Sequence, residues 1–474
     1  MNPKERAQYK RLVLTPINKL IPRLALPAVF SMLITMIYNL VDAYFVGRLG
    51  TSASASIGIL VSVQSVFQAL GFMFGQGSGS NISRHLGMGD QKAASRIASL
   101  GFFSTLLISL VPAILGLIFI TPLMRFLGST ETILPYSIHY GFYILISGPA
   151  LAVSCVLNNI LRYEGRAFYS MFGLVTGGVL NMIGDPILMF GFHMGIDGAG
   201  LSTALSQYIS LGVLLYMVLS GKTISRVSLR ELAWNRTYFT AILKNGFPSL
   251  IRQVLNSIAT ATLNICANPY GDAAIAAMAI VSRVVMFLAS TMMGIGQGFQ
   301  PVSSYNYGAK KYRRIRQAFF FTWRSGELVL GVLAVLCMLV PGPVIRIFRD
   351  DPDVVRIGAL ALRLQCIAII VQPLGVMTNM LFQSIGRSRQ ASFTATLRSG
   401  VYYIPALLIL PRFFGLVGIQ SAQTVADILT ALTCIPFTVR FFREIPEEDQ
   451  TTEVDLAYQK AVASEAKNKY AQES

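Results

Sequence analysis

Apolar stretches of 20 or more residues recur along the whole of this sequence, and they restrict its fold more than any other feature. A helix of that length crosses the roughly 30 Å hydrocarbon core of a bilayer. Charged residues make up 13% of the chain, about half of the usual share in soluble domains. The sequence therefore predicts an all-α polytopic membrane protein.

We expect twelve transmembrane helices, six in each half of the chain. An even number of spans places both chain ends on the same side of the membrane. The predicted spans are 24–46, 53–80, 97–122, 137–160, 168–190, 199–220, 246–267, 273–300, 318–344, 358–382, 391–410 and 415–438.

The basic residues indicate which side that is. If both termini are cytoplasmic, the inner segments carry 23 Lys and Arg and the outer loops carry 6, in agreement with the positive-inside rule. The net charge of +17 then reflects topology, and we expect no nucleic-acid partner. The first 23 residues are polar and basic, so we expect no cleavable signal peptide. The stretch from Glu444 holds eight of the 22 acids and is predicted to be solvated or disordered.

The two halves of the sequence match each other at an offset of 221 residues. Internal repeats of this kind are typical of secondary transporters. The matched positions include Pro27 with Pro248, Gly50 with Gly271, GQG at 75–77 with GQG at 296–298, and Asn158 with Asn379. The predicted parts are a cytoplasmic N-terminal segment (1–23), an N-lobe (24–220), a cytoplasmic linker (221–245), a C-lobe (246–440) and a polar cytoplasmic tail (441–474).

Two aspartates break this repeat. Asp42 and Asp185 lie near the outer ends of the first and fifth spans, and apolar residues occupy the equivalent positions of the second half. Each has a polar neighbour one helical turn before it, Tyr38 and Asn181 respectively. Carboxylates within a span are costly and usually mark ion or proton paths. The alternative is a structural hydrogen bond near the interface.

Two carboxylates close together in a low dielectric resist double ionisation, so one of them should retain a proton. The pair could instead hold Na⁺ with further oxygen ligands. The sequence offers Asn158, Asn181 and Thr203 for that purpose, and the possible Na⁺ ligands are Asp42, Asn181, Asp185 and Thr203.

A second polar pair is expected in the second half. Arg283 and Asp427 lie at similar depth on the eighth and twelfth spans, and they could form a structural or substrate-binding pair. We interpret Arg252, Arg363 and Arg398 as snorkelling side chains.

Four segments resemble the multidrug and toxic compound extrusion (MATE) family, in the DinF-like and MepA-like branch. They are LPAVFSMLITMIYNLVDAYFVGRLG, GQGSGSNISRHLGMGD, LNMIGDPILMFGFHMGIDGAGLSTALSQ and GIGQGFQPVSSYNYGAKKY. The resemblance implies twelve helices in two lobes and drug export in exchange for protons or sodium. It also implies a site made of Tyr38, Asp42, Asn158, Asn181, Asp185 and Thr203. The NorM-like branch carries acids in its seventh and tenth helices, which are missing from the middle of those spans here.

We therefore expect a secondary active antiporter that exports cationic amphipathic compounds in exchange for H⁺ or Na⁺ by alternating access. It should be a monomer in a bacterial plasma membrane, with no catalytic residues and no cofactor besides the coupling ion. One alternative is a flippase of a lipid-linked saccharide with the same fold, which would line its cavity with arginines. A membrane-embedded transferase or protease is the other, but the sequence shows no catalytic motif for either.

Overall fold

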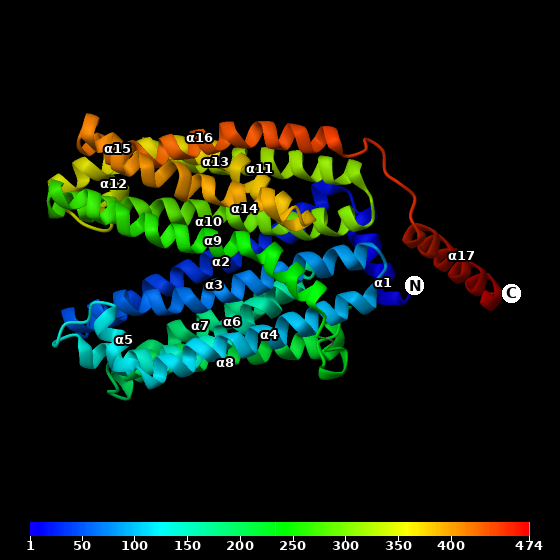
Figure 1. Ribbon diagram of the computed structural model, residues 1–474, viewed down its shortest axis with the longest axis horizontal. Helices are drawn as coiled ribbons and strands as arrows, with labels where there is room; N and C mark the ends of the chain where they lie inside the picture. The colour runs from blue at the N-terminus through cyan, green and yellow to red at the C-terminus, as the bar shows by residue number, and fades with distance from the viewer. Residues whose placement is uncertain (233, 474) are drawn as a thin grey trace. The chain divides into compact units, whose positions relative to one another are not determined.

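The structure, a computed structural model, describes residues 1–232 and 234–473, with side chains to residue 465. This part of the chain is helical and contains no strand (Figure 1). Eleven of its helices are long and apolar enough to cross a membrane. The remaining predicted span, 246–267, lies within α9 (Arg236–Ala267), whose 32 residues include several polar side chains. The predicted all-α polytopic fold class is confirmed.

The chain divides into two compact units. Unit 1 comprises Met1–Leu12, Phe30–Gly246 and the chain from Thr452, and unit 2 comprises Val13–Val29 and Phe247–Thr451. Unit 1 contains α1 (Pro3–Tyr9), most of α2 (Ile17–Gly47), α3 (Thr51–Gly87), α4 (Gln91–Ile118), α5 (Ile120–Phe126), α6 (Leu134–Tyr163), α7 (Ala167–Pro186), η2 (Ile187–Gly191), α8 (Ile196–Met217), η3 (Val218–Lys222), η4 (Leu229–Glu231) and α17 (Glu453–Glu473). Unit 2 contains most of α9, η5 (Asn268–Tyr270), α10 (Asp272–Gly308), α11 (Tyr312–Leu339), α12 (Pro341–Arg346), α13 (Pro352–Ile385), α14 (Ser388–Thr396), η6 (Leu397–Tyr403), α15 (Ile404–Phe414) and α16 (Leu416–Glu444). The short η1 (Lys10–Leu14) joins α1 to α2.

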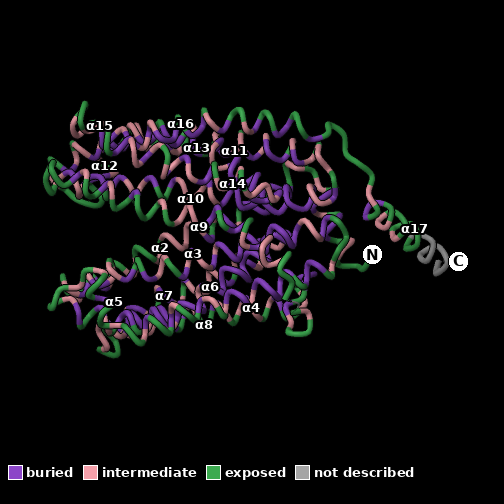
Figure 2. Tube along the Cα trace, viewed as in Figure 1, coloured by how far each residue is buried: buried purple, intermediate pink, exposed green. Residues whose placement is uncertain are grey.

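The fourth spanning helix of each repeat forms the centre of its unit. In unit 1, α6 packs against α3, α4, α7 and α8. Of the residues in its 18-residue apolar stretch, 83% are buried, and Figure 2 shows the burial along the chain. In unit 2, α13 packs against α10, α11, α14 and α16. The repeat seen in the sequence is therefore also a repeat of packing.

Each unit includes part of the first helix of the other repeat. The beginning of α2 belongs to unit 2 and the beginning of α9 to unit 1. The last glycine of each GQG motif lies against the first-helix segment that belongs to the other repeat. A Cβ on Gly77 would lie 2.1 Å from the carbonyl oxygen of Ile242, and a Cβ on Gly298 would lie 2.6 Å from the amide nitrogen of Ala25. The repeated motif thus permits a helix contact that a larger residue would block.

The tail is solvated over most of its described length, as expected, but it contains the helix α17, whose first turn is packed. Val454 and Asp455, at the start of α17, are buried. The Tyr9 hydroxyl donates to Asp455, and the Tyr9 ring stacks on Tyr458 with 4.6 Å between centroids. Asp455 also accepts from the Thr452 amide at 2.7 Å, which caps the helix. An acidic composition did not reveal these contacts, since they depend on the distant N-terminal helix α1.

Candidate functional site

A buried polar cluster joins α7 to α8 in unit 1. Asp185 is fully buried, and its Oδ1 accepts from Asn181 Nδ2 at 3.1 Å. The same amide nitrogen lies 3.2 Å from Thr203 Oγ1 and 3.4 Å from Ser202 Oγ. Ser202 in turn donates to the Asn181 carbonyl at 3.3 Å. The structure therefore brings together three of the residues that the sequence analysis selected.

Local backbone features allow this approach. A Cβ on Gly184 would lie 2.5 Å from Ser202 Oγ, so glycine at this position lets α7 and α8 come close together. Directly after Asp185, Pro186 ends the regular helix and the π-helical turn Ile187–Gly191 follows. Proline lacks an amide donor, and π-turns are frequent at functional sites.

Asp42 joins this cluster from α2. The Asp185 carboxyl and the Tyr140 hydroxyl are polar neighbours of its carboxyl group. Tyr140, on α6, also has Thr203 as a polar neighbour. Tyr38, one turn before Asp42, packs against α7 beside Gly178. Four helices, α2, α6, α7 and α8, therefore contribute to a single polar centre.

Three buried oxygen atoms in this centre have no hydrogen-bond partner: Asp42 Oδ1, Asn181 Oδ1 and Asp185 Oδ2. Among the described residues, neither aspartate forms an ion pair with Lys or Arg. Buried polar atoms are nearly always satisfied, and an uncompensated buried carboxylate is costly. The arrangement is suited to take up a proton or a small cation that prefers oxygen ligands.

Asn158 has a different position from the one expected for an ion ligand. Its Nδ2 donates to the Ser170 carbonyl at 2.9 Å, about four helical turns before Asp185. Its repeat partner Asn379 makes the matching bond to the Ala391 carbonyl at 2.7 Å. Because both units contain this contact and only unit 1 contains the acid pair, the contact ties the fourth helix to the fifth.

The predicted partner of Asp427 also has to be corrected. Asp427 Oδ1 accepts from Arg398 Nε at 2.6 Å, and no ion pair joins it to Arg283 within the part of the chain that the structure describes. Arg398, expected to snorkel, lies on the neighbouring fifth helix of unit 2. Depth along a span could not reveal this pairing, because it does not say which way a side chain points.

Sequence reasoning missed Tyr140 and Ser202. Ser202 adjoins the selected Thr203, so a search for polar neighbours would have found it. Tyr140 lies in an apolar span without any motif, and only the tertiary arrangement, in which α6 packs against α7 and α8, brings it to the acids.

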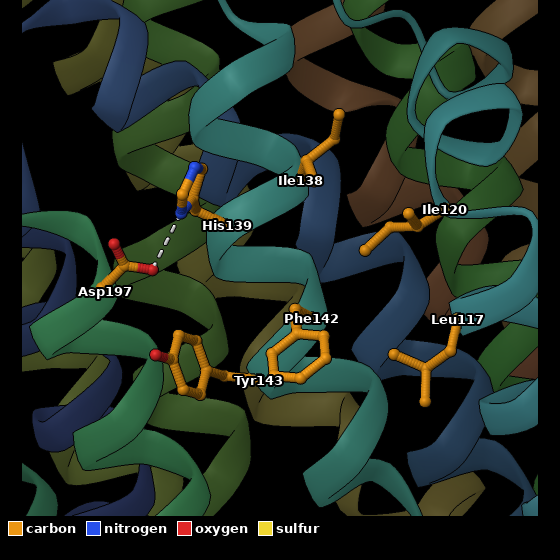
Figure 3. A pocket seen from close by; sticks show the side chains of 7 residues that line it. All are labelled: Leu117, Ile120, Ile138, His139, Phe142, Tyr143 and Asp197. Atoms are coloured by element: carbon orange, nitrogen blue, oxygen red, sulfur yellow. Dashed lines mark hydrogen bonds and ion pairs between the residues drawn. The ribbon is translucent and has the colours of Figure 1, made fainter.

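A separate cavity of about 360 Å³ opens between α4, α5, α6 and α8 of unit 1 (Figure 3). None of the predicted site residues lines it. Its polar edge is the contact between His139 Nδ1 and Asp197 Oδ1, at 3.1 Å. The remaining lining residues are Leu117, Ile120, Ile138, Phe142 and Tyr143. The one carboxylate of this cavity already has a partner, unlike the unpartnered oxygens of the acid pair.

Comparison with known proteins gives consistent results. The MatE family model matches residues 27–187 and 248–408, one match in each repeat. The multidrug export protein MepA of Staphylococcus aureus (strain MSSA476) is 27% identical over 426 residues, covering 89% of this chain and 93% of that protein. MepA of Staphylococcus haemolyticus (strain JCSC1435) is 28% identical over 417 residues, covering 88% and 92%.

Solved structures share the fold. One, described as the outward-facing conformation of a multidrug resistance MATE family transporter of the MOP superfamily, has a TM-score of 0.87 at 24% identity, with 92% of this chain and 98% of that chain covered. A crystal structure of MATE in complex with MaL6 has a TM-score of 0.88 at 24% identity, with 94% and 99% covered.

Proposed function

Because the chain belongs to the MATE family of multidrug transporters, in the branch of the MepA exporters, we propose that it exports cationic amphipathic compounds in exchange for protons. Alternating access would carry the substrate across the membrane. The observation that supports this proposal most is the group of three unpartnered oxygens at Asp42, Asn181 and Asp185.

The two carboxyl groups favour a proton as the coupling ion. They are neighbours in the same buried centre, and two carboxylates close together in a low dielectric resist double ionisation, so that one of them should retain a proton. With both ionised, the centre would repel itself and attract a cationic substrate instead. Protonation and substrate binding would therefore oppose each other, which is the coupling that an antiporter needs.

The ion can drive export only if it binds the two conformations with different affinity. Asp42 on α2 and Asp185 on α7 belong to different helices of unit 1. A proton shared between them would hold these helices together, and its loss would let them separate. We propose that this change in unit 1 lowers substrate affinity when the proton is taken up.

Sodium is the second candidate for the coupling ion. Asn181 Oδ1 is a neutral oxygen without a partner, and Thr203 Oγ1 lies beside the same side chain. Hard cations prefer such mixed oxygen ligands. A Na⁺ ion between the acids would neutralise the centre as a proton does.

Purified protein in liposomes separates the two ions. In the absence of sodium, an imposed pH gradient should drive a fluorescent cationic dye toward the acidic side, opposite to the flow of protons. An imposed sodium gradient at equal pH should have little effect on the dye. Dye movement driven by a sodium gradient alone would mean that the coupling ion is Na⁺ and not the proton. If neither gradient moved the dye, the antiport proposal would be wrong.

A further inference from the structure

Unit 2 contains a polar centre of opposite character to the acid pair. Arg398 donates from Nε to Asp427 Oδ1 at 2.6 Å and from Nη2 to Oδ2 at 3.4 Å. Gln423 Nε2 donates to the same carboxylate at 3.1 Å. Gln372, with its carbonyl turned toward the guanidinium, accepts from Nη1 and Nη2 at 3.1 Å each. The guanidinium is thus held in one orientation from two sides.

This centre uses the same helices of the repeat as the acid pair. The acid pair and its neighbours lie on the first, fourth, fifth and sixth helices of the first half. In unit 2, Gln372 lies on the fourth, Arg398 on the fifth and Asp427 on the sixth, while Ser399 Oγ donates to Asn256 on the first at 2.6 Å. The duplicated scaffold therefore carries two acids in one unit and a charge-balanced arginine in the other.

The arginine is the accessible member of the ion pair. The Asp427 side chain is 2% exposed, whereas the Arg398 side chain is 32% exposed. A charged group within a span faces the protein interior or a water-filled space rather than lipid. Arg398 also lies in the π-helical segment Leu397–Tyr403, and such segments are frequent at functional sites.

The first helix of this unit has a polar face, which contacts the chain next to Arg398 through Asn256 and Ser399. Ser249 accepts from Gln383 at 2.7 Å, Arg252 donates to Asn379 at 3.1 Å, and Asn256 accepts from Ser399. These α9 positions follow helical spacing. Asn256 remains exposed in spite of its bond. Polar residues on this face agree with the absence of α9 from the eleven helices that are apolar enough to cross a membrane.

We infer that Arg398 is a binding site for the carboxylate of a zwitterionic, aromatic amphiphile. The bonds to Asp427 and Gln372 use four of its five N–H donors, which leaves one Nη1 hydrogen for a ligand. The exposed guanidinium face can also stack on a planar aromatic group. Asp427 and Gln372 are positioning residues, because they orient the guanidinium and keep its charge compensated when no substrate is bound. This inference rests on the proposed export function and assigns the recognition of one part of the substrate to a residue of unit 2.

Two dyes that differ only in the carboxylate test the inference. Rhodamine B carries a free carboxylate beside its cationic ring system, and its ethyl ester carries the cation alone. The test variant is the double substitution Arg398→Gln with Asp427→Asn, which removes both charges and so leaves no unpaired charge in the core. Arg363→Gln, an exposed arginine on α13 outside this centre, is the matched control.

The double variant should export rhodamine B at least roughly tenfold more slowly than the unmodified protein, as expected for loss of a charged hydrogen bond. Its export of the ethyl ester should stay within roughly twofold, and Arg363→Gln should change neither rate. Equal loss for both dyes would show that the ion pair is only structural and would overturn the site. Unchanged export of both dyes, or no export of rhodamine B by the unmodified protein, would also overturn it. Export of neither dye by the unmodified protein would contradict the proposed function itself.

Discussion

At the scale of single residues, Asp42 and Asp185 each have a buried oxygen without a hydrogen-bond partner, and we propose that they carry the coupling proton. We predict that Asp185→Asn abolishes export, because an amide cannot gain and lose the coupling proton. The same change should keep or raise the melting temperature, since it removes a buried carboxylate that has no cationic partner. Dye export in liposomes and thermal unfolding in detergent measure the two effects. Asp197→Asn, which alters an aspartate paired with His139 outside the site, should leave export intact. Retained export in Asp185→Asn would contradict the assignment.

Glu164, which follows the end of α6, gives a pH-dependent prediction. Burial raises the pKa of its carboxyl above the ordinary 4.5, in spite of bonds from Ser225 and the Ile224 amide. The folded protein thus retains this proton at pH values where the unfolded chain has lost it. The resulting stabilisation is complete below the unfolded pKa and disappears as the pH rises through the folded value.

Accordingly, the melting temperature of the unmodified protein relative to Glu164→Gln should fall as the pH rises from the acidic range toward neutrality. A series of melts at constant ionic strength measures this difference. A difference that is constant with pH, or that grows in the opposite direction, would mean that the carboxyl does not titrate as stated.

Individual residues also show where sequence reasoning succeeds and where it fails. Asp42 and Asp185 were predictable because a carboxylate within an apolar run is costly whatever its partners are. Asn158 was selected as a possible oxygen ligand and by resemblance, and the structure shows that its bond recurs in the unit that has no acids. Arg398 was interpreted as snorkelling because its partner lies on another helix, and neither spacing nor depth specifies the direction of a side chain.

At the scale of elements, the contact between α3 and the beginning of α9 depends on glycine. We predict that Gly77→Val destabilises the protein by about 1–3 kcal/mol or more, because the new side chain would overlap the Ile242 carbonyl. Gly58→Val, in the same helix with nothing within 4 Å of a Cβ, should change stability by less than about 0.5 kcal/mol. Thermal unfolding of the two variants under one condition provides the comparison. Equal melting temperatures would show that this contact does not need glycine.

The docking of α17 on α1 gives a second prediction at this scale. Tyr9→Phe and Asp455→Asn should each make α17 more sensitive to proteolysis, and the double variant should show less than the sum of the two effects. Both substitutions weaken the same buried hydrogen bond, so their effects are coupled, and Asp455→Asn also weakens the bond from the Thr452 amide. Additive effects would indicate that the two residues stabilise α17 independently.

Elements were easier to predict than the contacts between them. Apolar length placed eleven of the twelve predicted spans on helices that are long and apolar enough to cross a membrane, since crossing a bilayer imposes a minimum length on a helix. The docked α17 was not predicted, because polar composition does not exclude a helix that packs through a few residues. The sequence also did not predict that the beginning of each first helix belongs to the unit of the other repeat. Both repeats carry the same Pro and Gly pattern, so this pattern does not distinguish the two units.

At the scale of the whole molecule, the two repeats share their helix packing but differ in the charged residues that they contain. Unit 1 holds two carboxyl groups with unpartnered oxygens, and unit 2 holds an arginine compensated by an aspartate. We attribute ion coupling to unit 1 and recognition of a carboxylate to unit 2.

Proton release on substrate binding tests the central claim most directly. A cationic dye is added to weakly buffered, sodium-free detergent solutions of the unmodified protein and of the double variant Asp42→Asn with Asp185→Asn, and the change in pH is recorded. The unmodified protein should release protons in proportion to the dye bound, and the double variant should release none. Equal proton release from both proteins would place the titrating group elsewhere and contradict the account.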